Sequence, residues 1–212
     1  MSKIEPRALA GLIVSGAVLL TTACGGGGQG GAPQQGMGGN MQQPAAGGMQ
    51  QQGGAPHTMT DVQGGWKRIA INGTSTSFEM PAPVDAQQSE TGMLRYVSKQ
   101  GKRSFTVGVS SRQFQQDQKN GVTNDAALDT WADQILQANL RTFEQMKLNP
   151  KINLVGKFNV GNSQAIQYSG KVGKADVTYI CYVTDLALYY LEVITQNPQS
   201  PEVQRFISSF KP

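Results

Sequence analysis

Few residues in this chain are suited to catalytic chemistry, because it contains one histidine and two cysteines. The histidine, His57, lies in a segment dominated by Gly, Gln and Met, so no His-based triad, His metal site or imidazole acid–base pair is expected in a folded domain. Cys181 stands in DVTYICYV in phase with Val177 and Val183, which is typical of a core thiol rather than a nucleophile. The sequence therefore predicts a protein that is not an enzyme and that holds neither a cofactor nor a metal.

A row of carboxylates offers another route to catalysis. Asp125, Asp129 and Asp133 recur at every fourth position, which places them on one face of a helix. Paired carboxylates can carry out hydrolysis without a histidine, so a carboxylate-based hydrolase is the less favoured alternative function. A carboxylate row near the start of a helix is more often a solvated face that interacts with the helix dipole, and we adopt that interpretation.

Soft metal ligands are scattered through the same glycine-rich segment as His57. Copper(I), which favours soft ligands, could be bound by Met37, Met41, Met49 and Met59 together with His57. Their spacing is irregular, and the segment has too little aliphatic or aromatic side chain to offset the entropy cost of folding. A plain flexible tether is the better interpretation.

The amino terminus has the pattern of an export signal. Lys3 and Arg7 precede an uncharged, mostly apolar run, residues 8–20, which small residues follow. A membrane-spanning helix needs about 20 predominantly apolar residues, whereas this run stops shortly before the glycines at 25–28. We therefore predict that residues 1–23 are a signal peptide rather than a transmembrane span.

Cys24 completes a motif that resembles the lipobox of bacterial lipoproteins. Thr22 and Ala23 match the small residues of that motif, although its leucine, Leu20, stands one place too early. We predict that Cys24 becomes lipidated and anchors the protein to a membrane of the cell envelope, facing the periplasm or the exterior. The alternative is ordinary signal-peptidase cleavage after Ala23, which would give a secreted soluble protein.

Residues 24–64 are predicted to be the lipidated cysteine and a Gly/Gln-rich flexible tether, and residues 65–212 a globular domain. A flexible chain of about 40 residues has a root-mean-square span of roughly 35 Å, comparable to the diameter of a small domain. The domain would therefore stay within reach of the membrane. The formal net charge of +4 is too small and too scattered to indicate nucleic-acid binding.

Two periodicities predict the secondary structure of the domain. Alternating apolar residues predict strands, and turn signals divide residues 152–196 into a four-stranded antiparallel meander. Apolar residues at the 3.6-residue spacing predict a long helix over 124–147, and Ser200 and Pro201 begin a short terminal helix. This order predicts the α/β (α+β) class, with an antiparallel sheet covered by helices.

Several segments resemble the PsbP-like/Mog superfamily as found in bacterial lipoproteins. They are WKRIAI, SFEMPAPV, the hairpin LRYVSKQGKRSFTVGVSS, the Tyr-rich YICYV and LYYLEVI, and the ending SPEVQRFISSFK. The resemblance covers most of residues 66–212, and it implies an α/β/α sandwich that acts as a binding or assembly module. The chain lacks the Gly-Tyr…Tyr-Pro…Gly-Trp start of the photosystem branch, so a photosynthetic role is not implied.

Five residues are candidate contacts for a partner. Lys99, Lys102 and Arg103 surround the turn of a predicted hairpin and could meet anionic lipid headgroups or an acidic partner. We prefer the interpretation of an ordinary soluble turn and a strand edge protected by charge. Tyr182 and Tyr189 belong to a cluster of tyrosines on neighbouring strands, where we place a hypothetical groove.

The leading functional hypothesis is a lipid-anchored envelope protein whose domain binds another envelope protein or helps to assemble one. Confinement near the membrane would raise the effective concentration of that partner. The alternative is a carrier or chaperone that holds a lipid or another small ligand in an apolar cavity between the sheet and the long helix.

Overall fold

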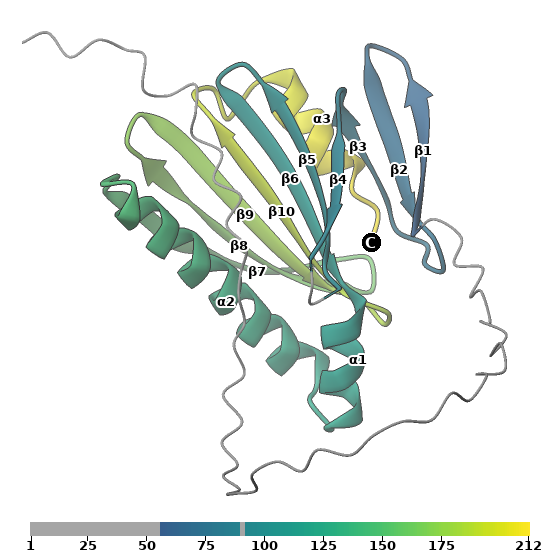
Figure 1. Cartoon of the computed structure of the whole chain (residues 1–212). Helices are drawn as coiled ribbons and strands as arrows, with labels where there is room; N and C mark the ends of the chain where they lie inside the picture. Colours follow the sequence, from purple (N-terminus) through teal and green to yellow (C-terminus); the bar gives the residue numbers. More distant parts are fainter. Residues whose placement is uncertain (1–55, 90–91) are drawn as a thin grey trace, which may run out of the picture.

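The computed structural model describes residues 56–89 and 92–212 (Figure 1). Within these residues the chain forms three helices and two antiparallel sheets, and the predicted α+β class is confirmed. The elements in chain order are β1 (His57–Val62), β2 (Trp66–Ile71), β3 (Ser77–Pro81), β4 (Asp85–Gln88), β5 (Leu94–Gln100), β6 (Arg103–Ser110), α1 (Ser111–Lys119), α2 (Asn124–Gln145), β7 (Pro150–Val160), β8 (Ser163–Val172), β9 (Ala175–Val183), β10 (Leu188–Thr195) and α3 (Pro201–Ser209).

The larger sheet has seven strands in the order β4-β5-β6-β10-β9-β8-β7. All its neighbouring strands are antiparallel, and β7 to β10 form the predicted meander. The turn between β7 and β8 contains Gly161 at a φ of 59°, a left-handed conformation that glycine adopts without a steric penalty. The smaller sheet has the order β1-β2-β3.

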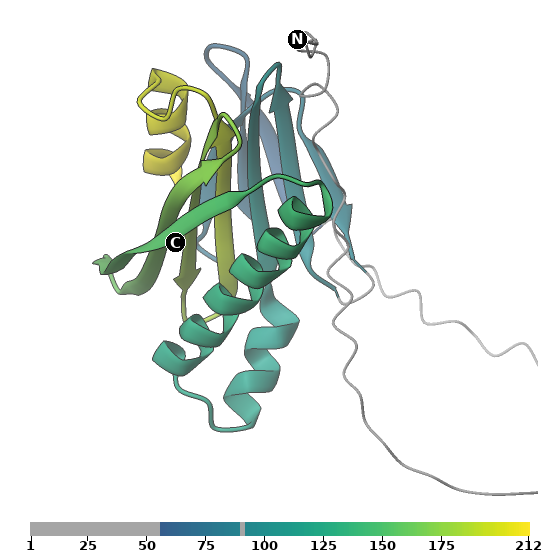
Figure 2. The same ribbon diagram turned by 90° about the vertical axis from the view of Figure 1, so that its left-hand side faces the viewer.

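The larger sheet lies between two different layers (Figures 1 and 2). Helix α2 crosses one face with α1 beside it, whereas α3 and the smaller sheet cover the other face. Buried apolar residues form one cluster on each face. The prediction of a sheet covered by helices is therefore confirmed, while the three-stranded sheet that shares a layer with α3 was not predicted.

Helix α2 begins and packs as its sequence predicts. The Thr123 hydroxyl accepts a backbone hydrogen bond from the first turn, which caps the helix. Leu128, Trp131 and Ile135 are buried against the sheet. The Trp131 Nε1 donates a hydrogen bond to the backbone oxygen of Tyr189 at 3.3 Å, which links α2 to β10.

Helix α3 also follows its prediction, with Pro201 in its first turn and the Ser200 hydroxyl as its cap. The ring of Phe206 packs edge-on against Phe105 of β6, with centroids 5.2 Å apart. The Phe210 ring, which follows the helix, lies 4.5 Å from the ring of Tyr182. These ring contacts pack α3 and the residue after it against the sheet.

An ion cluster joins α3 to the smaller sheet. Glu79 of β3 lies between Arg68 of β2 and Arg205 of α3, with nitrogen–oxygen distances of 2.7 and 2.8 Å. Burial acts to raise the pKa of Glu79, but the hydrogen bonds from Arg205 and Arg68 outweigh it and hold that pKa below its usual range. Arg205 also lies 4.4 Å above the Trp66 ring, a cation–π contact.

Two elements differ from the expected organisation. The first strand begins at His57, inside the segment expected to be tether, and pairs with β2 from His57 opposite Ile71 to Val62 opposite Trp66. Its sequence HTMTDV is poor in aliphatic residues, so the strand depends on the ladder with β2 rather than on a hydrophobic run of its own. Helix α1 was missed because it buries only Phe114 and therefore shows no apolar periodicity.

Candidate functional site

The tyrosines predicted to line a groove are core residues. Tyr182 is 3% exposed and Tyr189 is 0% exposed, and both belong to the cluster beneath α3 and the smaller sheet. The Thr76 hydroxyl donates a hydrogen bond to the Tyr189 hydroxyl at 2.9 Å, and burial raises the pKa of Tyr182 to about 12. The hypothesis of a groove through these two rings is wrong, because both faces of the sheet are covered at this point.

The basic residues at the β5–β6 turn remain at the surface. Lys99 and Lys102 are exposed on either side of Gly101, as the hairpin prediction required. Arg103 forms an ion pair with Glu202 of α3 at 3.1 Å, so its charge helps to hold α3 in place. In the described part of the chain, Lys99 and Lys102 make no ion pair, so both are available to a partner. They lie far from the predicted tyrosines, because Lys99 is paired near the start of β6 and Tyr189 is paired near its end.

The two cysteines have different outcomes. Cys181 is 0% exposed within the cluster beneath α2, and burial raises the pKa of its thiol far above the usual value. The interpretation of Cys181 as a core thiol is confirmed, because a protonated, inaccessible sulfur is a poor nucleophile. Cys24, the predicted lipidation site, lies outside the described residues.

The aspartate row on α2 is a solvated, ion-paired face. Lys157 of β7 lies 3.3 Å from Asp125 and 2.6 Å from Asp129, while the side chains of both aspartates are at least half exposed. The hydrogen bond to Asp129 is the main cause of the raised pKa of Lys157. Asp133 accepts a hydrogen bond from Gln137 on the same helix. The lysine engages two carboxylates of the row in ion pairs at the surface, which favours the solvated-face interpretation.

A buried carboxylate was missed by the sequence reasoning. Glu192, in the middle of β10, is 5% exposed and accepts a hydrogen bond from the Thr106 hydroxyl at 3.2 Å. Burial raises its pKa, an effect that Arg95, the Thr106 bond and Tyr179 partly oppose. The available signal was a single acidic residue inside the apolar run LYYLEVI. The group is enclosed among core side chains, which favours a structural role.

The space between the sheet and α2 is filled by side chains. Tyr190 packs so closely over Gly108 that a Cβ at Gly108 would lie 1.9 Å from the tyrosine ring. The buried members of this cluster are Phe114, Ala127, Leu128, Trp131, Ala132, Ile135, Phe143, Ile166, Val172, Val177, Tyr179, Cys181, Val183, Leu188 and Tyr190. This packing disfavours the carrier hypothesis, which required an apolar cavity in this layer.

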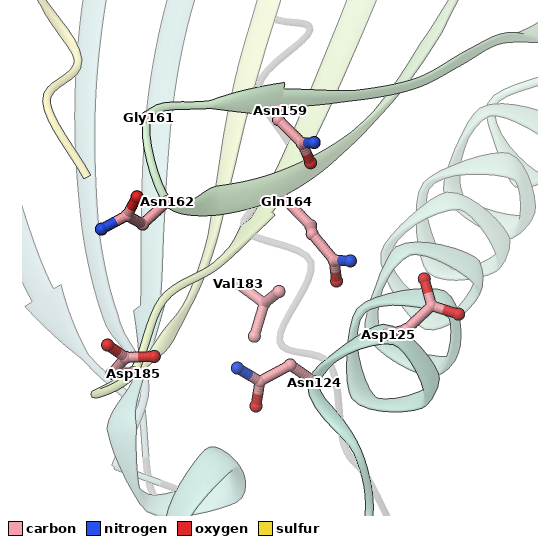
Figure 3. Close-up of a pocket in the computed structure, with 8 residues that line it drawn as sticks. All are labelled: Asn124, Asp125, Asn159, Gly161, Asn162, Gln164, Val183 and Asp185. Atoms are coloured by element: carbon pink, nitrogen blue, oxygen red, sulfur yellow. The ribbon is translucent and has the colours of Figure 1, made fainter.

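An open polar pocket lies between the start of α2 and the β7–β8 turn (Figure 3). It has a volume of about 460 Å³, and Val183 is the apolar residue at its floor. The other lining residues are Asn124, Asp125, Asn159, Gly161, Asn162, Gln164 and Asp185. Carboxamides and carboxylates from separate elements can hydrogen-bond to a polar ligand or a peptide, but they include no nucleophile or imidazole.

A second cleft of about 460 Å³ lies on the opposite face, between α3 and strands β8 and β9. It combines the polar side chains Gln167 and Ser169 with Ile207 of α3. Within residues 56–89 and 92–212, no group of three or more His, Cys, Asp or Glu side chains is arranged to hold a metal ion. None of the helices in the same residues is long and apolar enough to cross a membrane.

Strand β7 is the outer edge of the larger sheet and exposes large apolar side chains. The exposed fractions are 59% for Leu154, 62% for Val155 and 38% for Phe158. The register with β8 shifts between Leu154 and Gly156, so Val155 lies at a bulge. Asn159, the residue before the last of the strand, lines the polar pocket. Sequence reasoning assigned this segment to the meander but did not identify it as an edge.

Comparisons with solved structures give remote structural neighbours. No family model matches the sequence, and no curated protein matches it. The solution structure of cyanobacterial PsbP (CyanoP) from Synechocystis sp. PCC 6803 is similar at 10% identity and a TM-score of 0.45, over 72% of this chain and 97% of that one. The crystal structure of PA94, a protein of unknown function from Pseudomonas aeruginosa, is similar at 13% identity and a TM-score of 0.34, over 74% of this chain and 98% of that one. At these TM-scores the superfamily remains a prediction from the sequence.

Proposed function

We propose that this protein is a non-catalytic binding or assembly module of the cell envelope, anchored to a membrane through lipidated Cys24. The observation that carries the binding role is the apolar edge of β7, where Leu154, Val155 and Phe158 are exposed beside an open polar pocket. Exposed apolar clusters on folded domains commonly mark sites of protein interaction. The reactive groups Cys181 and Glu192 are buried in the core, which supports a role without catalysis.

The anchor and the domain have separate tasks in this proposal. The acyl chains on Cys24 hold the protein at the membrane, and the Gly/Gln-rich segment leaves the domain free to search the adjacent space. Because the anchored domain meets a partner in the same membrane at a raised effective concentration, the two can associate without a high intrinsic affinity. The resemblance of the sequence to PsbP-like/Mog proteins, which are mostly binding or assembly modules, agrees with this division of tasks.

The anchor is tested by the intact mass and the detergent partitioning of the mature protein, produced in a host with the lipoprotein pathway. We expect the wild type to begin at an acylated Cys24 and to enter the detergent phase, and the Cys24→Ala variant to stay in the aqueous phase. Cys181→Ala is the matched control, since this thiol is buried and should leave the partitioning unchanged. A wild-type protein without acyl chains would contradict the anchor.

The binding role is tested by cross-linking in intact cells. We expect the wild type to form discrete cross-linked products with another envelope protein, and we expect Cys24→Ala to reduce their yield, because the variant loses its confinement at the membrane. Turnover of a substrate by the purified protein, abolished by substitution of Glu192 or the α2 aspartates, would instead show an enzyme.

A further inference from the structure

Within the residues that the structure describes, no strand pairs with the outer edge of β7. The strand has 11 residues and pairs only with β8, so one side of its backbone has no partner in the sheet. Such an edge can accept another extended chain through main-chain hydrogen bonds. The side chains at its centre, Leu154 and Val155, are apolar and mostly exposed.

Strand β7 carries two devices that normally protect an edge, a proline at its first residue and the bulge at Val155, but the exposed side chains at its centre are apolar. Lysines over an edge strand usually discourage pairing, and β7 carries two of them, Lys151 and Lys157. Lys157 is drawn toward α2 by its ion pairs with Asp125 and Asp129. Lys151 is exposed and makes no ion pair with any residue that the structure describes, so its charge is free to select a partner.

The charges at this end of the edge favour an acidic occupant. Lys151 lies directly opposite Lys171 of β8, and β7 itself contains no acidic residue. Lys171 is paired with Asp176 at 2.7 Å, so of these two exposed lysines Lys151 is the one without an ion pair among the described residues. An opposite charge beside Lys151 would be favourable, and a like charge would be unfavourable.

Two other occupants fit these charges less well. The β7 strand of a second copy would bring lysines and no carboxylate to the edge. The amino-terminal segment of this chain has no acidic residue between Arg7 and Asp61, so it cannot supply the charge either. A segment of a different protein is the occupant that the charges favour.

We infer that β7 is a docking edge that receives an extended segment of a partner protein by antiparallel strand addition. This inference rests on the proposed function and names the surface it uses. Because every pair in the sheet is antiparallel, the partner runs opposite to β7, and its carboxyl-terminal end lies beside Lys151. The partner segment is therefore apolar in its centre, over Leu154 and Val155, and acidic near its carboxyl end.

The test is a titration of the purified protein with synthetic peptides. The acidic-end peptide alternates Val and Thr and carries two Asp residues at its carboxyl end. The basic-end peptide replaces these with two Lys residues, and the reversed peptide carries the two Asp residues at its amino end. We expect saturable binding of the acidic-end peptide and weaker binding of the other two.

Two variants assign the binding to β7. Lys151→Glu should lower the affinity for the acidic-end peptide about fivefold and raise the affinity for the basic-end peptide by a similar factor. The reason is that the substitution reverses the charge that faces the carboxyl end of the peptide at an exposed position. Val155→Asp should lower the affinities for the acidic-end and the basic-end peptides about tenfold. Lys102→Glu is the matched control, since it makes the same charge change at the β5–β6 turn, and it should change neither affinity.

Several results would overturn the inference. One is that the acidic-end peptide does not bind, and another is that the reversed peptide binds more tightly than the acidic-end peptide does. A third is that Lys102→Glu and Lys151→Glu lower the affinity for the acidic-end peptide equally. Concentration-dependent dimers that Val155→Asp disrupts would assign the edge to a second copy. Binding to phosphatidylglycerol vesicles that Lys151→Glu abolishes would assign it to a lipid surface. None of these results depends on Cys24, so the anchor can fail or succeed independently.

Discussion

The two edges of the larger sheet differ in length, composition and exposure. Strand β4, at one edge, has four residues, and all of them, Asp85 to Gln88, are exposed and small or polar. Strand β7, at the other edge, has 11 residues and exposes Leu154, Val155 and Phe158. A short polar edge resists pairing with another chain, whereas a long apolar edge invites it. The contrast supports the proposal that β7, rather than β4, is the edge that receives a partner.

The largest expected effect comes from separating β7 from the sheet. A Cβ on Gly170 of β8 would lie 1.9 Å from the backbone oxygen of Lys151, so Gly170→Ala must displace β7. We expect the free energy of unfolding, measured in urea, to fall by about 3 kcal/mol. Peptide binding at β7 should be lost as well, while the β4 edge keeps its pairing with β5.

The matched control for this change is Gly156→Ala, in β7 itself. A Cβ at Gly156 would meet nothing within 4 Å, and its φ does not lie in the left-handed region. We expect a change in the free energy of unfolding within about 0.5 kcal/mol. Equal losses for the two variants would show that the close approach at Gly170 is not what holds β7 in its register.

An intermediate effect on the free energy of unfolding is expected at the buried Glu192, which lies in β10 between the two edges of the sheet. Its folded-state pKa is raised by burial, so the folded state binds a proton more tightly than the unfolded state does. Stability is therefore lost as the pH rises from the unfolded pKa through the higher folded pKa. We expect Glu192→Gln to raise the free energy of unfolding by about 1 kcal/mol at neutral pH and to lose this advantage in acid.

Urea unfolding of the wild type and of Glu192→Gln, measured from acid to neutral pH, gives the difference in their free energies of unfolding. Thr106→Val is a useful companion variant, because it removes the hydroxyl that donates to Glu192 and should destabilise the protein. A Glu192→Gln advantage that grows as the pH falls would contradict the raised pKa.

The smallest effect on stability is expected at the exposed apolar residues of β7. Leu154→Thr and Val155→Thr remove side chains that are 59% and 62% exposed, so each should change the free energy of unfolding by no more than about 0.5 kcal/mol. Both variants should still lower the affinity for the acidic-end peptide. A stability loss comparable to that of Gly170→Ala would show instead that these side chains belong to the fold rather than to a binding edge.

The parts of the fold with one clear periodicity could be predicted from the sequence. The long helix and the β7–β10 meander follow from apolar spacing, and Thr123, Ser200 and Pro201 mark the helix starts. The three-stranded sheet and α1 could not be predicted in the same way. Strand β1 depends on its partner β2, and α1 buries a single phenylalanine.

The site was harder to predict than the fold, because it depends on which faces and edges are covered. Alternation correctly places Tyr182 on the opposite face of β9 from Tyr179, and Tyr189 on the opposite face of β10 from Tyr190, but it does not reveal that both faces of these strands are buried. Likewise, the sequence of β7 does not show that the strand is outermost, a property that the order of the whole sheet determines. The anchor, by contrast, is a prediction that rests on the sequence around Cys24 alone.

The most direct test of an open β7 edge is amide hydrogen exchange, measured for individual residues with and without the acidic-end peptide. We expect slower exchange along residues 150–160 when the peptide is bound, unchanged exchange along β4, and no protection of β7 in Val155→Asp. Protection confined to the polar pocket or to the β5–β6 turn, with β7 exchanging as in the free protein, would contradict strand addition at this edge.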